Sequence, residues 1–128
     1  MAKKRNAKLY DQNIVDALKK IPSLIIDKKH QFYIYFNNDQ NRSNEKRFEH
    51  IASKRHELKV SDIELIEKGI NNYFYFEKNK SLKGTYHYYI KRKGNNKGFI
   101  KVAIRLIKEK TKKYYVKTIF IVYQIKKL

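Results

Sequence analysis

The chain has 128 residues, the usual size of a single domain, and its formal net charge is +19. It contains no cysteine, which excludes disulfides and thiolate metal sites and fits a reducing cytoplasm, where we expect the protein to act. No apolar segment follows the basic N-terminus, and no stretch has the length of a membrane-spanning helix. We therefore expect neither a signal peptide nor a membrane protein.

The positive charge is concentrated towards the C-terminus. Residues 78–128 contain sixteen Lys or Arg residues and one acid, Glu109, whereas residues 1–77 contain fifteen Lys or Arg residues and eleven acids. Such an asymmetry indicates a face that binds a polyanion. RNA is the first candidate partner and an acidic immunity or antitoxin protein is the second.

The N-terminal part of the chain predicts short elements. We expect residues 1–12 to form a basic flexible arm and residues 13–128 to form one α+β domain. The elements expected after the arm are a helix at 13–20 that ends before Pro22, a strand at 32–36, a polar loop at 37–43, a helix at 44–58 and a short helix opened by a capping box at Ser61–Glu64.

Two histidines, His50 and His56, lie on the helix expected at 44–58. The apolar stripe of this helix is formed by Phe48, Ile51, Ala52 and Leu58, and it includes the cation Arg55, which would need a partner if buried. His56 borders the stripe, and His50 lies about 120° away from His56 around the helix. Both rings therefore reach one phosphate only at a helix end or a bend; otherwise His50 is a solvated residue and His56 a boundary residue.

Four strands are predicted in the C-terminal half, at 72–78, 85–93, 98–108 and 113–125. Their hairpin connections predict a four-stranded antiparallel sheet with the N-terminal helices packed on it. Alternation predicts an even-numbered core face over the last three strands, which includes Tyr88, Ile90, Ile100, Val102, Ile104, Tyr114, Val116, Thr118, Phe120 and Val122.

The odd-numbered face of the same strands is predicted to carry polar and basic groups. It includes His87, Lys91, Lys101, Arg105 and Lys117. With symmetric turns, His87, Arg105 and Lys117 become neighbours across three strands, and a one-residue bulge would separate them. We interpret His87, Lys91, Arg105 and Lys117 as phosphate- or RNA-binding residues, although His87 between tyrosines also fits a packing role.

The residue types favour RNA chemistry without a metal or cofactor. Clustered carboxylates, a phosphate-binding glycine loop and a zinc-spaced histidine set are all missing. Histidine can transfer protons while a ribose 2′-hydroxyl attacks the adjacent phosphate, and Lys or Arg can stabilise the charge that develops there. We expect His30 to be a loop residue, and Thr118 also fits as a β-branched strand residue.

The segment from Arg47 to Lys126 resembles the phage-associated barnase–EndoU–colicin–RelE-like nuclease domains. The similar motifs are the helical segment Glu49–His56, the Ser61–Ile66 helix, the aromatic Tyr86–Ile90 strand, the Ile100–Ile104 strand and the terminal Tyr115–Phe120 strand. The resemblance implies a metal-independent ribonuclease of a toxin system or mobile element. By position it implies catalytic roles for His50, His56, Lys101 and Thr118, although alternation places Thr118 and Lys101 on opposite faces.

The leading interpretation is thus a metal-independent endoribonuclease. The alternative is a non-catalytic basic protein that binds RNA or DNA through the same face. A third interpretation is an interaction protein that docks on an acidic partner, with binding that survives high salt.

Overall fold

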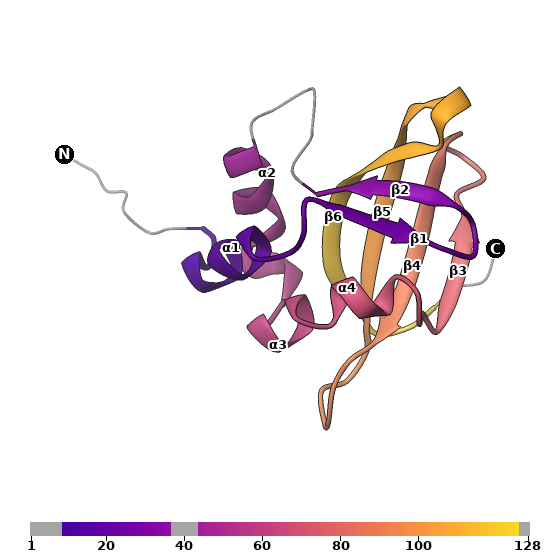
Figure 1. The fold of residues 1–128 in the computed structure, drawn as a ribbon. Helices are drawn as coiled ribbons and strands as arrows, with labels where there is room; N and C mark the ends of the chain where they lie inside the picture. Colours follow the sequence, from indigo (N-terminus) through magenta and orange to yellow (C-terminus); the bar gives the residue numbers. More distant parts are fainter. Residues whose placement is uncertain (1–8, 37–43, 126–128) are drawn as a thin grey trace.

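The structure, a computed structural model, describes residues 9–36 and 44–125. The loop expected at 37–43 and the first eight residues of the expected arm lie outside the described residues. The elements are α1 (Gln12–Lys19), β1 (Leu24–Asp27), β2 (Phe32–Tyr35), α2 (Asn44–Ile51), the 3₁₀ helix η2 (Lys54–His56), α3 (Val60–Ile63), α4 (Ile66–Gly69), β3 (Tyr75–Lys78), β4 (Thr85–Lys91), β5 (Phe99–Lys108), the 3₁₀ helix η3 (Glu109–Thr111) and β6 (Lys113–Val122) (Figure 1).

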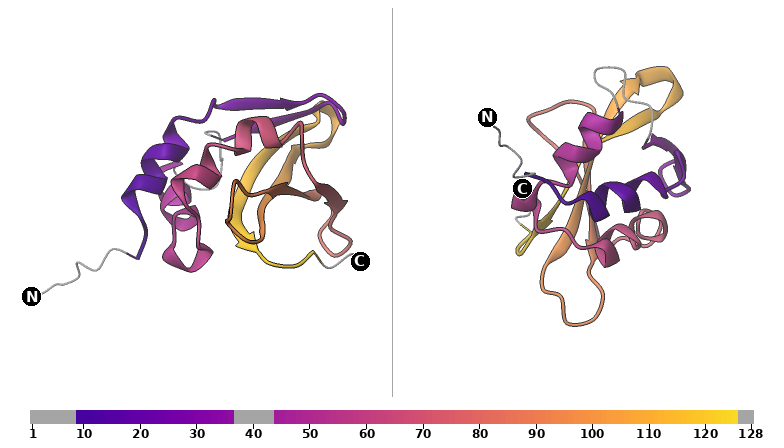
Figure 2. Two further views of the ribbon diagram at one scale, coloured as in Figure 1. Left: turned by 90° about the horizontal axis from the view of Figure 1, so that it is seen from below. Right: turned by 90° about the vertical axis from the view of Figure 1, so that its left-hand side faces the viewer.

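All the strands belong to one curled sheet of six, in the order β1-β2-β6-β5-β4-β3 (Figure 2). The α+β class is confirmed, but the prediction of a four-stranded antiparallel sheet is wrong. The predicted antiparallel strands β3–β6 are present, and the β1–β2 hairpin extends them through a parallel pairing of β2 with β6. This pairing joins Tyr33 to Lys113, and a local sequence pattern carries no sign of so distant a partner.

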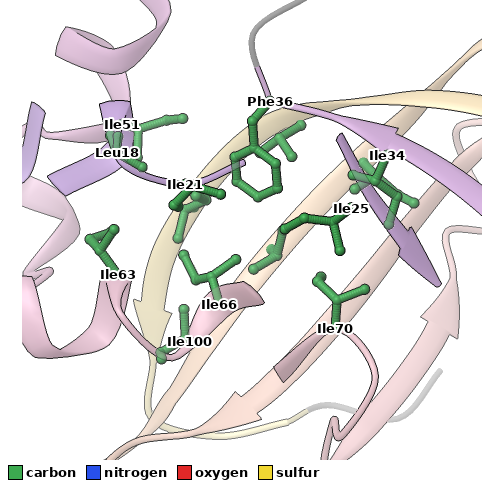
Figure 3. Packing of buried hydrophobic residues seen from close by; sticks show 14 of the residues in the cluster. Leu18, Ile21, Ile25, Ile34, Phe36, Ile51, Ile63, Ile66, Ile70 and Ile100 are labelled. Carbon is green, nitrogen blue, oxygen red and sulfur yellow. The ribbon is translucent and has the colours of Figure 1, made fainter. Parts of the chain in front are cut away.

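The hydrophobic core lies on the inner side of the curl, where α4 packs inside the curled sheet and against β4 (Figure 2). Figure 3 shows side chains of the helical segments meeting those of the strands; they include Leu18, Ile63, Ile66 and Ile70 on one side and Ile25, Ile34 and Ile100 on the other. Ile63, Ile66 and Ile70, which recur at helical spacing in the sequence, are all buried. The single short helix predicted there is divided into α3 and α4. Among the described residues, no helix combines the length and the apolar character that crossing a membrane requires.

Gly69 lets α4 approach β4 closely. A Cβ atom at this position would lie 2.7 Å from both Cδ1 and Cγ2 of Ile90. We expect Gly69→Ala to lower the free energy of unfolding by about 1–3 kcal/mol, because overpacking outweighs the helix propensity gained. Urea denaturation measures the loss, which should be smaller in an Ile90→Val background. Equal losses in both backgrounds would contradict this account.

A buried ion pair fastens α3 to the β4–β5 hairpin. The Nε and Nη2 atoms of Arg92 donate to the two carboxylate oxygens of Asp62, each at 2.9 Å, and Nη1 donates to the carbonyl of Lys97 at 2.7 Å. Asp62 also accepts the backbone N–H of Lys59 at 2.9 Å. The predicted capping box at Ser61–Glu64 is therefore wrong: Ser61 lies inside α3, whose N-cap residue is Lys59. Asp62, the third residue of α3, accepts the backbone N–H of this N-cap residue with the same carboxylate that binds Arg92.

Residues 9–11 are attached to the turn that follows α2. The backbone N–H of Asp11 donates to the carbonyl of Ala52 at 3.0 Å, and that of Lys54 donates to Leu9 at 3.2 Å. Tyr10 and Ser53 form a β-bridge. The described part of the expected arm thus supports the turn that leads to His56.

Candidate functional site

A bend after α2 brings the two helical histidines together. The helix ends at Ile51 and the chain restarts as η2 at Lys54, so the predicted continuous helix at 44–58 is wrong. The rings of His50 and His56 lie 5.3 Å apart between centroids and are nearly perpendicular, at 86°. The bend therefore brings together two histidines that a straight helix would keep on different faces.

Hydrogen bonding fixes the orientation of His56. Its Nδ1 lies 3.0 Å from the carbonyl oxygen of Ile51. A carbonyl only accepts, so Nδ1 carries a proton and Nε2 is the nitrogen that can gain or lose one. The ring also lies 5.9 Å from that of Phe120, which places His56 beside β6.

A β-bulge in β6 reverses the alternation of this strand. Ile104 pairs with Val116 but Ala103 pairs with Thr118, so Lys117 is the extra residue. Ile119 and Ile121 then enter the core, while Thr118 and Phe120 turn outwards. The predicted core face of β6 is therefore wrong beyond Val116, and Thr118 shares a face with Lys101.

Lys101 occupies the centre of this outer face, which we define by Glu77, His87, Tyr89, Lys101, Thr118 and Phe120. It pairs with Tyr89 on one side and with Phe120 on the other. Its Nζ lies 5.5 Å from the ring centroid of Tyr89 and 5.4 Å from that of Phe120. The two rings hold the ammonium group by cation–π attraction next to Thr118.

A carboxylate–histidine pair lies on the same face. Nδ1 of His87 lies 3.1 Å from Oε2 of Glu77, and the hydroxyl of Tyr89 donates to the same oxygen at 2.6 Å. Burial raises the pKa of Glu77, but the hydrogen bonds from Tyr89 and His87 outweigh it and the net pKa is lowered. Burial and the hydrogen bond to Glu77 also raise the pKa of Tyr89, which therefore stays a neutral donor.

The predicted row of His87, Arg105 and Lys117 does not form. His87 pairs with Ala103, two residues from Arg105, and Arg105 pairs with Tyr115, two residues from Lys117. The turns are therefore not symmetric as assumed, and both hairpin registers differ by two residues from the expected ones. Lys117 still acts on His87 through its charge, which contributes to lowering the pKa of that ring. Arg105 is exposed towards one end of the face.

Lys91 lies at the other end of β4, away from the central group. It pairs with Phe99, and its Nζ lies 4.8 Å from the ring centroid of Phe74. Of the residues predicted from sequence, the structure therefore groups His50 with His56 and links His56 to Lys101 through Phe120. Thr118 and His87 lie on the same face as Lys101, and Lys117 is the bulge residue. Lys91 and Arg105 flank this group.

The buried cation of the α2 region is Arg47 rather than Arg55. Arg55 is exposed because the helix has ended before it, so its predicted place on a buried stripe is wrong. Arg47 is 1% exposed, and its Nη1 donates to the carbonyl of Val116 at 2.7 Å, next to the bulge residue. Arg47 thus ties α2 to the part of β6 that turns Thr118 outwards.

A hollow of about 600 Å³ opens beside His50. It is lined by Leu9, Tyr10, Lys46, Glu49, His50, Ser53, Lys54 and Arg55. Three cationic side chains, Lys46, Lys54 and Arg55, outnumber the one acid, Glu49, around this space, which suits the phosphate backbone of a nucleic acid.

Sequence reasoning missed Glu77, Tyr89 and Phe120 as parts of the site. Glu77 had a detectable signal, because residues 72–108 contain no other acid. His30 lies in the turn between β1 and β2, so its prediction as a loop residue is confirmed. Sequence reasoning did not reveal that its Nδ1 lies 2.7 Å from the buried carboxylate of Asp27, which also accepts from Tyr88. His30 stacks on Phe76 at 4.1 Å, on the core side of the sheet and away from the outer face.

No protein-family model, curated protein or solved structure matches this chain. Among the described residues, no three His, Asp or Glu side chains are grouped so that they could hold a metal ion. The functional proposal therefore rests on the chemistry of the outer face itself.

Proposed function

We propose that the protein is a metal-independent endoribonuclease whose site is the outer face together with His50 and His56. The observation that carries this proposal is the β6 bulge. The bulge at Lys117 reverses the alternation of side chains in β6, so Thr118 lies on the same face as Lys101. His56 borders this face through its contact with Phe120. Proton-transfer groups, a cation and a hydroxyl donor are then available to one phosphate.

The reaction needs three contributions from these side chains. Histidine nitrogens take the proton of the attacking 2′-hydroxyl and give one to the leaving 5′-oxygen, and His56 presents Nε2 for such a transfer. The ammonium group of Lys101 stabilises the negative charge that grows on the phosphorane. The Thr118 hydroxyl donates a hydrogen bond to a phosphate oxygen, and His50 and the cations around the adjacent hollow bind neighbouring phosphates.

A second candidate function is binding of RNA or DNA without cleavage. It is favoured by the charge of +19 and by the many exposed lysines, which would hold a polyphosphate whatever the histidines do. This function places no demand on the orientation of His56 or on the bulge.

Incubation of the wild-type protein with total cellular RNA in excess EDTA separates the two functions. We expect discrete fragments that end in 2′,3′-cyclic phosphates, because an internal 2′-hydroxyl is the nucleophile. A 2′-deoxy oligonucleotide is the matched substrate, which should bind but stay intact. Intact RNA in the presence of folded, RNA-bound protein would refute cleavage and leave the binding function.

A further inference from the structure

We infer that His87, oriented by Glu77, is the general base that removes the 2′-hydroxyl proton. The inference deepens the proposed function and rests on it. It gives His87 a chemical role instead of a phosphate-binding role, and it makes Glu77 a positioning residue. His56 is then the group that protonates the leaving oxygen.

The contacts of the His87 ring select one of its nitrogens for chemistry. Nδ1 of His87 lies 3.1 Å from Oε2 of Glu77, and the same oxygen accepts a hydrogen bond from the Tyr89 hydroxyl at 2.6 Å. These two contacts fix the direction of the carboxylate. The side chains of His87 and Glu77 are only 12% and 11% exposed, which limits competition from water. A carboxylate accepts hydrogen bonds, so in the neutral ring Nδ1 carries the proton and Nε2 bears the lone pair.

Nε2 of His87 is open to a substrate. Among the described residues, the buried side-chain nitrogen and oxygen atoms without a hydrogen bond are Nε of Arg47 and Oγ1 of Thr85. In the described part of the chain, Nε2 of His87 forms no hydrogen bond, and it does not belong to that group, so it is not completely buried. A proton acceptor that is anchored at one end and open at the other is what a general base requires.

The surroundings of His87 keep its ring neutral near pH 7. The titratable groups that face it are Glu77 on β3, Tyr89 on its own strand, Lys101 on β5 and Lys117 on the β6 bulge. Burial lowers the pKa of His87, and the two lysines lower it further, while Glu77 raises it. The net pKa lies below the ordinary value of 6.5, so the base is in its active form at neutral pH.

The proposed step conserves atoms and charge. The O–H bond of the 2′-hydroxyl breaks and its proton moves to Nε2 of His87, while the 2′-oxygen forms a bond to phosphorus. The bond from phosphorus to the 5′-oxygen breaks, and that oxygen takes a proton from Nε2 of a protonated His56. The products are a 2′,3′-cyclic phosphate and a free 5′-hydroxyl, and hydrolysis or solvent exchange resets the two imidazoles.

The test is the pH dependence of kcat/KM for a short RNA substrate in EDTA. For the wild type, we expect kcat/KM to fall towards acid pH as the base becomes protonated. The midpoint of this acidic limb should lie below pH 6.5. His87→Asn keeps an amide donor for Glu77 but has no proton acceptor, and it should lose about 10²–10⁴-fold in rate together with this limb. Glu77→Gln removes the charge that raises the pKa of His87. The acidic limb of this variant should therefore move to lower pH, and its rate should fall less than that of His87→Asn.

His30→Asn is the matched control, because His30 is also held by a carboxylate but lies on the core side of the sheet. Its acidic limb should coincide with that of the wild type, even if the protein is less stable. Circular dichroism and binding of the 2′-deoxy oligonucleotide establish that each variant is folded. Active wild type with an unchanged limb in folded His87→Asn would overturn the role of His87 alone, whereas inactive wild type would overturn the ribonuclease as well.

Discussion

Replacing His56 by alanine is expected to lower the rate of RNA cleavage by about 10²–10⁴-fold. The Ile51 carbonyl fixes the proton on Nδ1, so Nε2 is the only ring nitrogen that can exchange one, and alanine removes it. RNA binding should change little, because most of the positive charge lies on other side chains. Single-turnover cleavage in EDTA measures the first effect, and titration with the 2′-deoxy oligonucleotide measures the second.

His56→Asn distinguishes a chemical role of His56 from a structural one. Its amide nitrogen can still donate to the Ile51 carbonyl and so preserve the bend after α2, but it cannot carry a proton to the leaving group. Asn and Ala should therefore be similarly inactive. Recovery of the wild-type rate by Asn would show that His56 only holds the bend, and the proton donor would have to be sought elsewhere.

Replacing Asp62 by asparagine is expected to lower the free energy of unfolding by about 3–5 kcal/mol. The side chains of Arg92 and Asp62 are only 5% and 0% exposed, so the change leaves a buried guanidinium without its counter-charge. The hydrogen bonding of Arg92 to Asp62, which accepts, is the largest cause that raises the pKa of Arg92, and the guanidinium stays charged in the variant. The expected loss is a large share of the stability of an ordinary domain.

Urea denaturation of the wild type, Asp62→Asn and Asp16→Asn measures this loss against a matched control. Asp16 is an exposed carboxylate on α1 whose side chain accepts a hydrogen bond from Gln12, so its replacement should cost less than about 0.5 kcal/mol. Similar midpoints for the two variants would mean that the Arg92–Asp62 pair adds nothing to stability.

The sequence predicted those elements whose apolar pattern is local. Tyr88 and Val102 belong to the even-numbered apolar positions of their strands, and Ile63, Ile66 and Ile70 recur at helical spacing, so their burial could be predicted. The strand β1 was not predicted, because its four residues are Leu-Ile-Ile-Asp, of which three are consecutively apolar. Alternation gives no signal there, although only Ile25 and Asp27 are buried.

The geometry of the candidate site depends on two interruptions that residue patterns do not reveal. The end of α2 before Ser53 depends on the pairing of Tyr10 with Ser53, which lies far away in the sequence. The bulge at Lys117 depends on the register between β5 and β6, and alternation assumes that no such bulge exists. For these reasons the residue types were predicted, but the shared face of Thr118 and Lys101 was not.

The parallel pairing of β2 with β6 also constrains the order in which the chain can fold. The β1–β2, β3–β4 and β4–β5 pairs join neighbouring segments and can form early, whereas the other edge of β2 has no strand to pair with until β6, which begins at Lys113, has been synthesised. The same late segment supplies Val116, to which Arg47 binds, and the bulge that orients Thr118. A nascent chain that stalls before β6 therefore already carries its histidines and Lys101, yet it lacks the surface that would bring them together.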